Sequence, residues 1–277
     1  MKTTVIGFLF ATGLALASST SSAAECVVKA PSNLVTSGTL TIGTMLAAPP
    51  QMFSDKGEPA GFEIDLSRAL AAEMCLEAKF ENLAFAGLFP GLNAKKFDYV
   101  SAGLGITPER QETFDFVPYF LGGIQFVARK GAKYSFSNEN DLCGRSVATI
   151  SGTTQARALE RVNKQICTPE QQIVLAYYPS FNDAVIQLRK KSTDVAFVDW
   201  PFAAYIVNLL PELALASPII SGRPEVPRNK LGMAFRKGNK EAADAVSKAL
   251  ENIQKSGAYE KLLVKWHLKN GDIRSAP

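Results

Sequence analysis

The chain has 277 residues, of which 47% are hydrophobic and 20% are charged, and its formal net charge is +4. This length is ample for a buried core in one large domain or two smaller ones. The charge is mild and no block of Lys and Arg is interleaved with aromatic residues, so the composition argues against nucleic-acid binding.

The N-terminal segment has the organisation of a secretory signal peptide. Lys2 is the only charge before Glu25, residues 5–17 are apolar or small, and residues 21–24 are all small. The apolar run is shorter than the roughly 20 residues that a membrane-spanning helix needs, and the order of its parts is that of a cleaved signal. We expect residues 1–23 to be removed and the mature protein to be periplasmic.

Four cysteines follow this segment: Cys26, Cys75, Cys143 and Cys167. An even number in an exported chain favours two disulfides. Pairing of sequence neighbours would join Cys26 to Cys75 and Cys143 to Cys167, which is one of three possible connectivities. A metal or redox site is not expected, because the chain has no Cys-x-x-Cys motif and a single histidine, His267. We therefore expect no metal and no cofactor.

Strand-like and helix-like segments then alternate along the chain. Apolar and β-branched runs predict strands at residues 39–45, 97–104, 146–150, 173–178 and 193–199. Apolar periodicity and capping residues predict helices at residues 64–75 and 85–96, from residue 153 or 154, from Ser180, and over 240–266 with a break at Gly257. This alternation predicts an α/β protein whose parallel sheets are covered by helices on both faces.

Two segments with a similar order of residues suggest two lobes of related design. Residues 95–98 lead into an apolar strand that ends near residues 103–105, and residues 190–194 lead into another that ends at Asp199. Ligands of such open sheets bind beyond the carboxyl ends of the strands. Arg110 follows one of these ends and Asp199 the other, so their opposite charges would suit a zwitterion between the lobes.

A free amino acid needs a donor for its carboxylate and an acceptor for its ammonium. The guanidinium of Arg110 can donate two parallel hydrogen bonds to a carboxylate. Gly103 and Gly105 come shortly before it, and a ligand can approach the backbone of glycines closely. Residues 150–155 form a small-residue loop that enters a helix, which suits an anion. Each of these residues also has a structural explanation. Arg110 can be a solvated residue of a turn, the loop of residues 150–155 can be a turn with an N-cap, and Asp199 can be a helix cap.

A set of short segments in a fixed order carries a resemblance to a known family. They are residues 38–44, 57–66, 85–92, 105–110, 115–119, 141–144, 152–155, 194–199, 257–259 and 263–266. In this order they resemble the polar amino-acid-binding family of periplasmic substrate-binding proteins of ABC importers, bacterial extracellular solute-binding protein family 3.

The resemblance covers nearly all of the mature chain and implies its architecture. The fold would be α/β and two-lobed, each lobe a mostly parallel sheet flanked by helices, joined by a two-crossing hinge. The first lobe would comprise residues 24–122 and 231–277 and the second residues 123–230. The crossings would fall near residues 121–126 and 230–234.

The resemblance also implies a set of ligand-binding residues. They are Met45, Ala48, Phe85, Gly103, Gly105, Arg110, Thr153, Thr154 and Asp199. Arg110, with the backbone around the two glycines, would bind the carboxylate, and Asp199 would bind the ammonium. Thr154, with Thr153 beside it, would bind from the second lobe, and Phe85 would pack on the ligand side chain.

Three of these positions depart from the family pattern. Gly105 stands where Ser or Thr is usual, and Ala48 stands where a stacking Tyr or Phe is common. Met45 stands where binders of cationic amino acids carry an acidic residue. We therefore expect a ligand that is not lysine- or arginine-like, either a less polar amino acid or a bulkier derivative.

The implied function is capture of an amino acid or derivative by hinge closure, followed by delivery to the membrane permease of an ABC importer. The protein would act as a periplasmic monomer and not as an enzyme. The alternative is a periplasmic enzyme on the same scaffold, similar to cyclohexadienyl or arogenate dehydratases. Met45 disfavours that alternative, because it leaves the first-lobe side of the pocket without an acidic group at that place.

Overall fold

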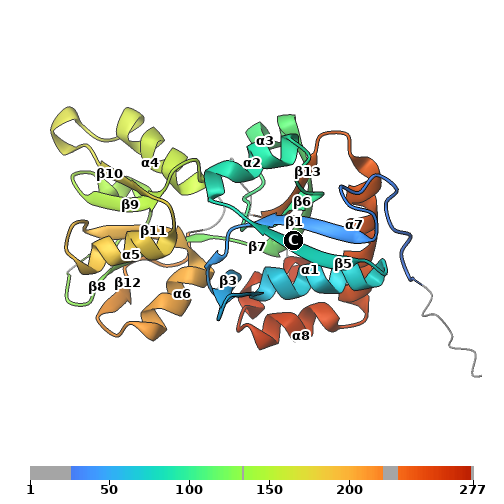
Figure 1. Cartoon of the computed structure of the whole chain (residues 1–277). Helices are drawn as coiled ribbons and strands as arrows, with labels where there is room; N and C mark the ends of the chain where they lie inside the picture. The colour runs from blue at the N-terminus through green and yellow to red at the C-terminus, as the bar shows by residue number, and fades with distance from the viewer. Residues whose placement is uncertain (1–25, 133, 221–229, 276–277) are drawn as a thin grey trace, which may run out of the picture.

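The computed structural model describes residues 26–132, 134–220 and 230–275. These residues form two lobes, each built on a five-stranded sheet, together with a small three-stranded sheet (Figure 1). The expectation of a two-lobed α/β fold is thereby confirmed. The signal peptide predicted for residues 1–23 lies outside the described residues.

The first sheet has the strand order β5-β1-β6-β13-β7. Its strands are β5 (Glu77–Asn82), β1 (Thr39–Thr44), β6 (Tyr99–Val100), β13 (Lys230–Arg236) and β7 (Phe114–Leu121). β1 runs parallel to β5 and β6, whereas β13 is antiparallel to β6 and β7. A strand from late in the chain thus completes a sheet that the N-terminal part begins.

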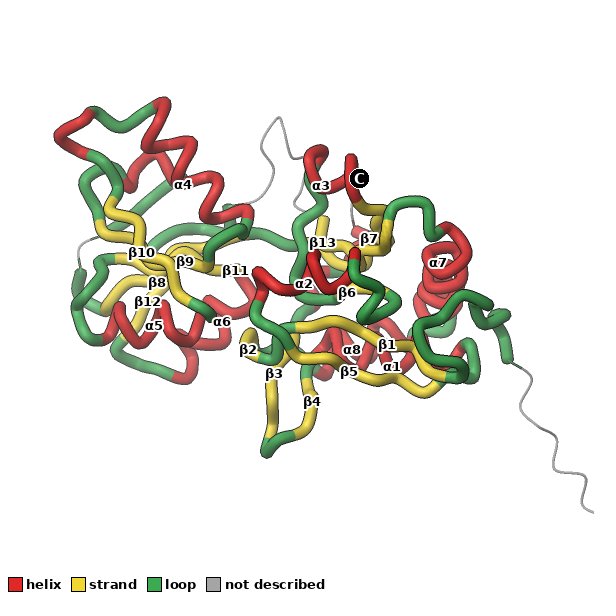
Figure 2. The backbone as a smooth tube through the Cα atoms, turned by 45° about the horizontal axis from the view of Figure 1, so that its top comes forward, coloured by secondary structure: helices red, strands yellow, loops and turns green. Residues whose placement is uncertain are grey.

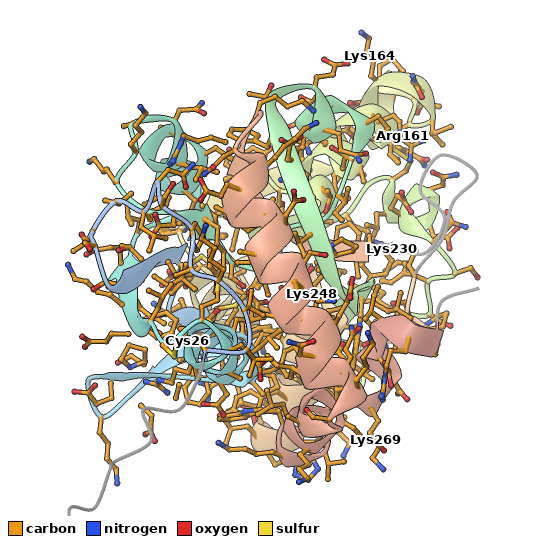
Figure 3. All side chains as sticks on the ribbon, turned by 90° about the vertical axis from the view of Figure 1, so that its right-hand side faces the viewer. Cys26, Arg161, Lys164, Lys230, Lys248 and Lys269 are labelled. Carbon is orange, nitrogen blue, oxygen red and sulfur yellow. A yellow bond between two sulfur atoms is a disulfide. The ribbon has the colours of Figure 1, made fainter. Side chains whose placement is uncertain are left out.

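Helices cover both faces of this sheet (Figure 2). They are α1 (Phe62–Glu73), α2 (Phe85–Asn93), α7 (Lys240–Lys255) and α8 (Ala258–Lys265). Leu231 and Met233 of β13 pack into the core beneath α1, α7 and α8, whereas Ala234 packs into the core beneath α2. This alternation follows from the two-residue period of a strand. Figure 3 looks onto α7, whose Lys248 points away from the core into solvent.

The second sheet has the order β10-β9-β11-β8-β12. Its strands are β10 (Val174–Tyr178), β9 (Ser146–Ile150), β11 (Val195–Asp199), β8 (Ile124–Arg129) and β12 (Leu213–Leu215). β9 is parallel to β10 and β11, and β8 is antiparallel to β11 and β12. In both five-stranded sheets, therefore, four strands run in one direction, and the fourth strand in the order, β13 or β8, runs antiparallel to them.

The second sheet is also covered on both faces. Its helices are α4 (Thr154–Gln165), α5 (Phe181–Arg189) and α6 (Trp200–Leu209). Val195 and Phe197 of β11 lie in the core beneath α4, whereas Val198 lies in the core beneath α5 and α6. That last core also contains Val100 and Leu104 of the first lobe, so one hydrophobic cluster bridges the two lobes.

The chain passes between the lobes after β7. This strand ends in the first sheet at Leu121, and β8 begins in the second sheet at Ile124. The first crossing predicted, near residues 121–126, falls on this passage. The return occurs before β13, and residues 221–229 lie outside the described part of the chain.

The strand predicted over residues 97–104 is much shorter in the structure, where only β6 is regular. The backbone turns at Gly103, whose φ is +62°. A positive φ lies outside the β region, so the extended backbone cannot run through Gly103 to residue 104. The helix predicted over residues 240–266 divides into α7 and α8 at Gly257, as expected.

Several elements were not predicted, among them the small sheet. Its strands are β2 (Ala47–Ala48), β3 (Met52–Asp55) and β4 (Glu58–Ala60). The unpredicted helix α3 spans Pro108–Thr113. Short 3₁₀ turns lie at Glu139–Leu142, Pro169–Gln171, Lys269–Gly271 and Ile273–Ser275.

Both disulfides join sequence neighbours, which confirms the favoured connectivity. Cys26 bonds Cys75 with a Cα–Cα distance of 5.5 Å, and Cys143 bonds Cys167 at 5.4 Å. The first bond ties the N-terminal segment, where Figure 3 labels Cys26, to the residues that follow α1. Within the described residues, no helix is both long and apolar enough to cross a membrane.

Candidate ligand-binding site

A pocket lies between the two lobes, beyond the carboxyl ends of β1, β6, β9 and β11. All nine residues predicted from the sequence line it. Five residues that were not singled out among those nine also line it: Met52, Ala102, Ile150, Gln155 and Phe181, of which Ile150 and Gln155 belong to the loop that the sequence analysis considered for an anion. The structure thus brings together segments that are up to about 150 positions apart in the sequence, as expected for strand ends that meet at one crevice.

Arg110 reaches the pocket from the short helix α3. Thr107 is the N-cap of this helix, and its hydroxyl oxygen accepts a hydrogen bond from the Arg110 N–H (3.2 Å). Pro108 at the first helical position suits this start, because its fixed φ is helical. The local sequence therefore holds the base of the Arg110 side chain in place.

The Arg110 guanidinium is buried and charged. It donates to the carbonyl oxygen of Gly105 (2.8 Å) in its own lobe and to that of Gly152 (3.3 Å) in the other. Its carbon atom lies 5.2 Å from the ring centre of Phe89 and 5.9 Å from that of Phe85. Burial lowers the pKa of Arg110 to about 10, with the nearby Arg157 adding to the shift. The group still carries its charge at neutral pH, and carbonyls do not neutralise it.

Asp199 enters the pocket from the opposite lobe, as the last residue of β11 and the residue before α6. Its Oδ1 accepts a hydrogen bond from the Gln155 side-chain amide (2.6 Å). It does not cap α6 with its side chain. Burial, helped by the charge of Glu63, raises the pKa of Asp199 to about 7, although the Gln155 hydrogen bond and Arg110 oppose the shift. Asp199 is therefore an acceptor whose ionised form lacks a full counter-charge.

The loop after β6 is held from below by Glu63. This carboxyl group is 1% exposed. It accepts hydrogen bonds from the Ser101 hydroxyl (2.6 Å) and the Gly103 N–H (3.1 Å). Burial raises the pKa of Glu63, while these hydrogen bonds oppose the shift. Glu63 does not line the pocket but fixes the backbone that does.

Besides Arg110 and Asp199, the start of α4 contributes polar groups to the pocket. Thr153 is its N-cap: the hydroxyl oxygen accepts from the Ala156 N–H (3.2 Å) and donates to the Ile150 carbonyl (2.7 Å). The Thr154 hydroxyl donates to the Gln155 side-chain oxygen (3.1 Å). A helix N-terminus presents free N–H groups and a positive dipole end. These groups are suited to an anionic ligand group.

The remaining pocket surface is apolar. It consists of Met45, Ala48, Met52, Phe85, Ala102, Ile150 and Phe181, all of which are buried members of the hydrophobic cluster that bridges the lobes. No metal-binding group of three or more His, Cys, Asp or Glu side chains exists among the described residues. His267 follows α8 and does not line the pocket.

Sequence signals existed for some of the residues that were missed. Gln155 follows the two threonines in the loop that enters α4. Phe181 follows the N-cap Ser180, whose hydroxyl accepts from the Asp183 N–H (3.2 Å), at the end of a strand. Glu63 stands three and seven positions before Leu66 and Leu70, which places an acid on the apolar stripe of α1.

Comparisons with known proteins agree with this geometry. The profile of the bacterial extracellular solute-binding proteins, family 3, matches residues 40–269. "ABC transporter arginine-binding protein 1" of Escherichia coli K12 is 29% identical over 229 residues, covering 82% of this chain and 90% of that protein. The "L-cystine-binding protein TcyJ" of the same organism is 29% identical over 232 residues, covering 83% of this chain and 82% of that protein.

A solved structure also matches over most of its length. "An ancestral arginine-binding protein bound to arginine" has a TM-score of 0.76 and 33% identity, covering 83% of this chain and 98% of that one.

Proposed function

Because the chain belongs to family 3 of the bacterial extracellular solute-binding proteins, we propose that it captures an α-amino acid or derivative between its lobes and delivers it to the permease of an ABC importer. The relatives named above are described as binding proteins. The dehydratase-like alternative therefore finds no support in them.

The observation that carries the proposal is the placement of one charge of each sign on opposite sides of one pocket. Arg110 comes from the first lobe and Asp199 from the second. Among the described residues they are the only ionisable groups that line the pocket. A zwitterion between them pairs with both, whereas an anion or a cation pairs with one and leaves the other unpaired.

The carboxylate of the ligand is proposed to bind Arg110. Guanidinium and carboxylate match as planar, bidentate partners, and such charge-assisted hydrogen bonds are stronger than neutral ones. The carbonyls that now accept from Arg110 use two of its five N–H groups. The N-terminus of α4, around Thr154, supplies further donors from the second lobe.

The ammonium is proposed to bind Asp199. Gln155 donates to Oδ1, which orients the carboxylate and leaves Oδ2 available to a ligand. Burial raises the pKa of Asp199, and a bound ammonium would favour its ionised form. Binding thus supplies the counter-charge that the closed pocket otherwise lacks.

Hinge closure would then depend on the ligand. The free volume of the pocket is about 20 Å³, which is room for about one water molecule. An amino acid needs the lobes to separate and close again around it. The Glu109–Arg157 ion pair at 3.5 Å bridges the lobes but is exposed, so it contributes only about 0–1 kcal/mol. Contacts of one ligand with both lobes would shift the equilibrium toward closure.

The remaining assignments follow from the same family. The mature protein is proposed to be a periplasmic monomer that begins after the signal peptide, residues 1–23. The lobes are proposed to comprise residues 24–122 with 231–277, and residues 123–230. The passage from β7 to β8 supports the first of these boundaries. The permease is proposed to recognise the closed form.

Thermal unfolding of ligand-stripped mature protein tests the proposal. An L-amino acid at about 100 times its Kd adds about 2.7 kcal/mol of stability, and the melting temperature rises by several degrees. Two matched analogues serve as controls: the methyl ester, which lacks the carboxylate, and the 2-hydroxy acid, which lacks the ammonium. Both should stabilise the protein less than the amino acid does. A screen in which no amino acid raises the melting temperature would contradict the proposal.

A further inference from the structure

We infer that the amino acid bound by this protein has an uncharged, apolar side chain. The inference rests on the proposed function and narrows it to one substrate class. It sets this chain apart from the solved arginine-bound structure that it resembles. Three observations support it. The two charged residues of the pocket are matched by the main-chain groups of the ligand, Glu63 is buried behind the pocket, and the remaining pocket surface is apolar.

Both pocket charges are needed by the main-chain groups of an amino acid. Arg110 and Asp199 are the only ionisable residues of the described chain that line the pocket, and each matches one end of the zwitterion. A charged side chain on the ligand would add a third charge. In the closed pocket that charge would be removed from water without an opposite partner, which is strongly unfavourable.

Glu63 does not supply the missing partner for a cationic side chain. Its two oxygens accept hydrogen bonds from the Ser101 hydroxyl (2.6 Å), the Gly103 N–H (3.1 Å) and the Gln51 side-chain amide (3.3 Å). It is 1% exposed and lies behind the pocket wall. A ligand cation could reach it only by displacing the Gly103 loop. The hydrogen bonds of Glu63 thus hold the loop after β6 and leave Glu63 unable to pair with a ligand.

The surface left for the side chain is apolar on both lobes. It is formed by Met45, Ala48, Met52, Phe85 and Ala102 of the first lobe and by Ile150 and Phe181 of the second. An apolar side chain that contacts this wall leaves water and gains affinity from its burial. A charged or strongly polar side chain would lose its hydration there without new hydrogen bonds.

The wall can adapt to side chains of different shapes. Met45 and Met52 are unbranched and flexible, so they can move to make room within a closed pocket. Ala48 and Ala102 are small and do not block the space beside them. We therefore expect the pocket to accept apolar amino acids of different side-chain lengths, such as leucine, methionine and phenylalanine.

Isothermal titration of ligand-stripped wild-type protein with an amino-acid panel tests the inference. The panel contains L-leucine, L-methionine, L-phenylalanine, L-glutamine, L-arginine, L-lysine and L-glutamate. We expect at least one of the first three to bind at least about tenfold more tightly than any of the other four. Tighter or equal binding of arginine, lysine, glutamate or glutamine would overturn the inference while leaving the proposed function intact. Failure of all seven amino acids to bind would overturn the inference, and failure of amino-acid derivatives as well would overturn the proposed function.

A variant pair tests the wall itself. Met45→Glu places an acid in the apolar wall, and it should reduce the preference for the apolar ligand over arginine by at least about tenfold. Met45→Gln, which is similar in shape but neutral, should weaken the apolar ligand without favouring arginine. Val264→Glu is the matched control, because Val264 is 46% exposed on α8 outside the pocket, and it should bind like the wild type.

An unchanged preference in a folded Met45→Glu protein would overturn the assignment of the wall. Folding is checked by circular dichroism and by the melting temperature. If Met45→Glu does not fold, the wild-type panel decides the inference by itself.

Discussion

Gly103 faces the carboxylate of Asp199 across the lobes: a Cβ built on Gly103 would lie 3.5 Å from Oδ2 of Asp199, at van der Waals contact. Gly103 belongs to the loop after β6 in the first lobe, and Asp199 ends β11 in the second, so the two lobes approach each other at these residues. Gly103 also has a φ of +62° and donates its N–H to Glu63 (3.1 Å). Gly103 thus allows the backbone to turn after β6 and allows the two lobes to come close together.

Replacing Gly103 by alanine should destabilise the protein and weaken ligand binding. A residue with a Cβ at positive φ costs about 1–2 kcal/mol. The added methyl group would also lie against Asp199 and 3.4 Å from the Met52 methyl carbon. We expect the free energy of unfolding to fall by about 1 kcal/mol and Kd to rise, as measured by urea unfolding and isothermal titration.

The matched control for this change is Gly131→Ala. Gly131 has a φ of +86° and no atom within 4 Å of its would-be Cβ. It should lose similar stability, because the backbone penalty is the same, but keep the wild-type affinity. Equal affinities of the two variants would contradict a role of the Gly103–Asp199 contact in binding.

Arg110→Lys should weaken binding even though it conserves the charge. Lysine has no planar fork to match a carboxylate, and truncating one partner of a buried charge pair costs about 2–5 kcal/mol. We expect Kd to rise by at least about 30-fold, as measured by isothermal titration. Arg189→Lys is the control, because Arg189 is half-exposed and pairs with Glu212 on the surface. A Kd of Arg110→Lys that matches that control would be inconsistent with the proposed carboxylate site.

Ligand affinity should fall as the pH falls through about 7. Burial raises the pKa of Asp199 to about 7, with Glu63 adding to the shift and Arg110 opposing it. An ammonium pairs with the ionised carboxylate, so a proton competes with the ligand. Kd should therefore rise by up to about tenfold for each pH unit below 7, and binding near pH 7 should release protons.

Calorimetry in buffers of different ionisation enthalpy measures this proton release. Asp199→Asn serves as the comparison: its binding should be weaker but independent of pH over the same range. A wild-type Kd that stays constant between about pH 8 and about pH 5 would rule out Asp199 as the ammonium partner.

The two disulfides should contribute to stability in the order of their loop lengths. Cys26–Cys75 closes a sequence separation of 49 and Cys143–Cys167 one of 24. The chain-entropy relation gives about 4 and about 3.5 kcal/mol. Paired serine substitutions should lower the unfolding free energy by these amounts and leave Kd unchanged, because no cysteine lines the pocket. Denaturant unfolding and titration of both variants check this, and the reverse order would contradict the entropic account.

Apolar runs and capping residues in the sequence predicted those helices and strands whose positions are set by residues close together in the chain. β9 and the start of α4 lie at the predicted residues, because an apolar run is followed by the N-cap Thr153. The order of the strands could not be obtained in this way. β13 pairs with β7 across more than a hundred residues, and periodicity contains no information on which distant strands meet.

The same limit applies to the site. The predicted residues stand at strand ends or in loops that enter helices, where parallel sheets place their ligands. Met52 and Phe181 were not predicted as site residues, because each lies in a segment whose approach to the pocket depends on packing between the lobes. Glu63 was not predicted either, since its role is to hold the Gly103 backbone and not to contact the pocket.

In the proposed site, Arg110 binds the ligand carboxylate and Asp199 binds the ammonium across the lobes. A cycle of four titrations tests this arrangement, with the preferred amino acid and its methyl ester each titrated into wild type and into Arg110→Met. If Arg110 binds the carboxylate, esterification should weaken binding to the wild type at least about tenfold more than to Arg110→Met. An equal loss in both proteins would show that the carboxylate is bound elsewhere, and it would contradict the proposed site.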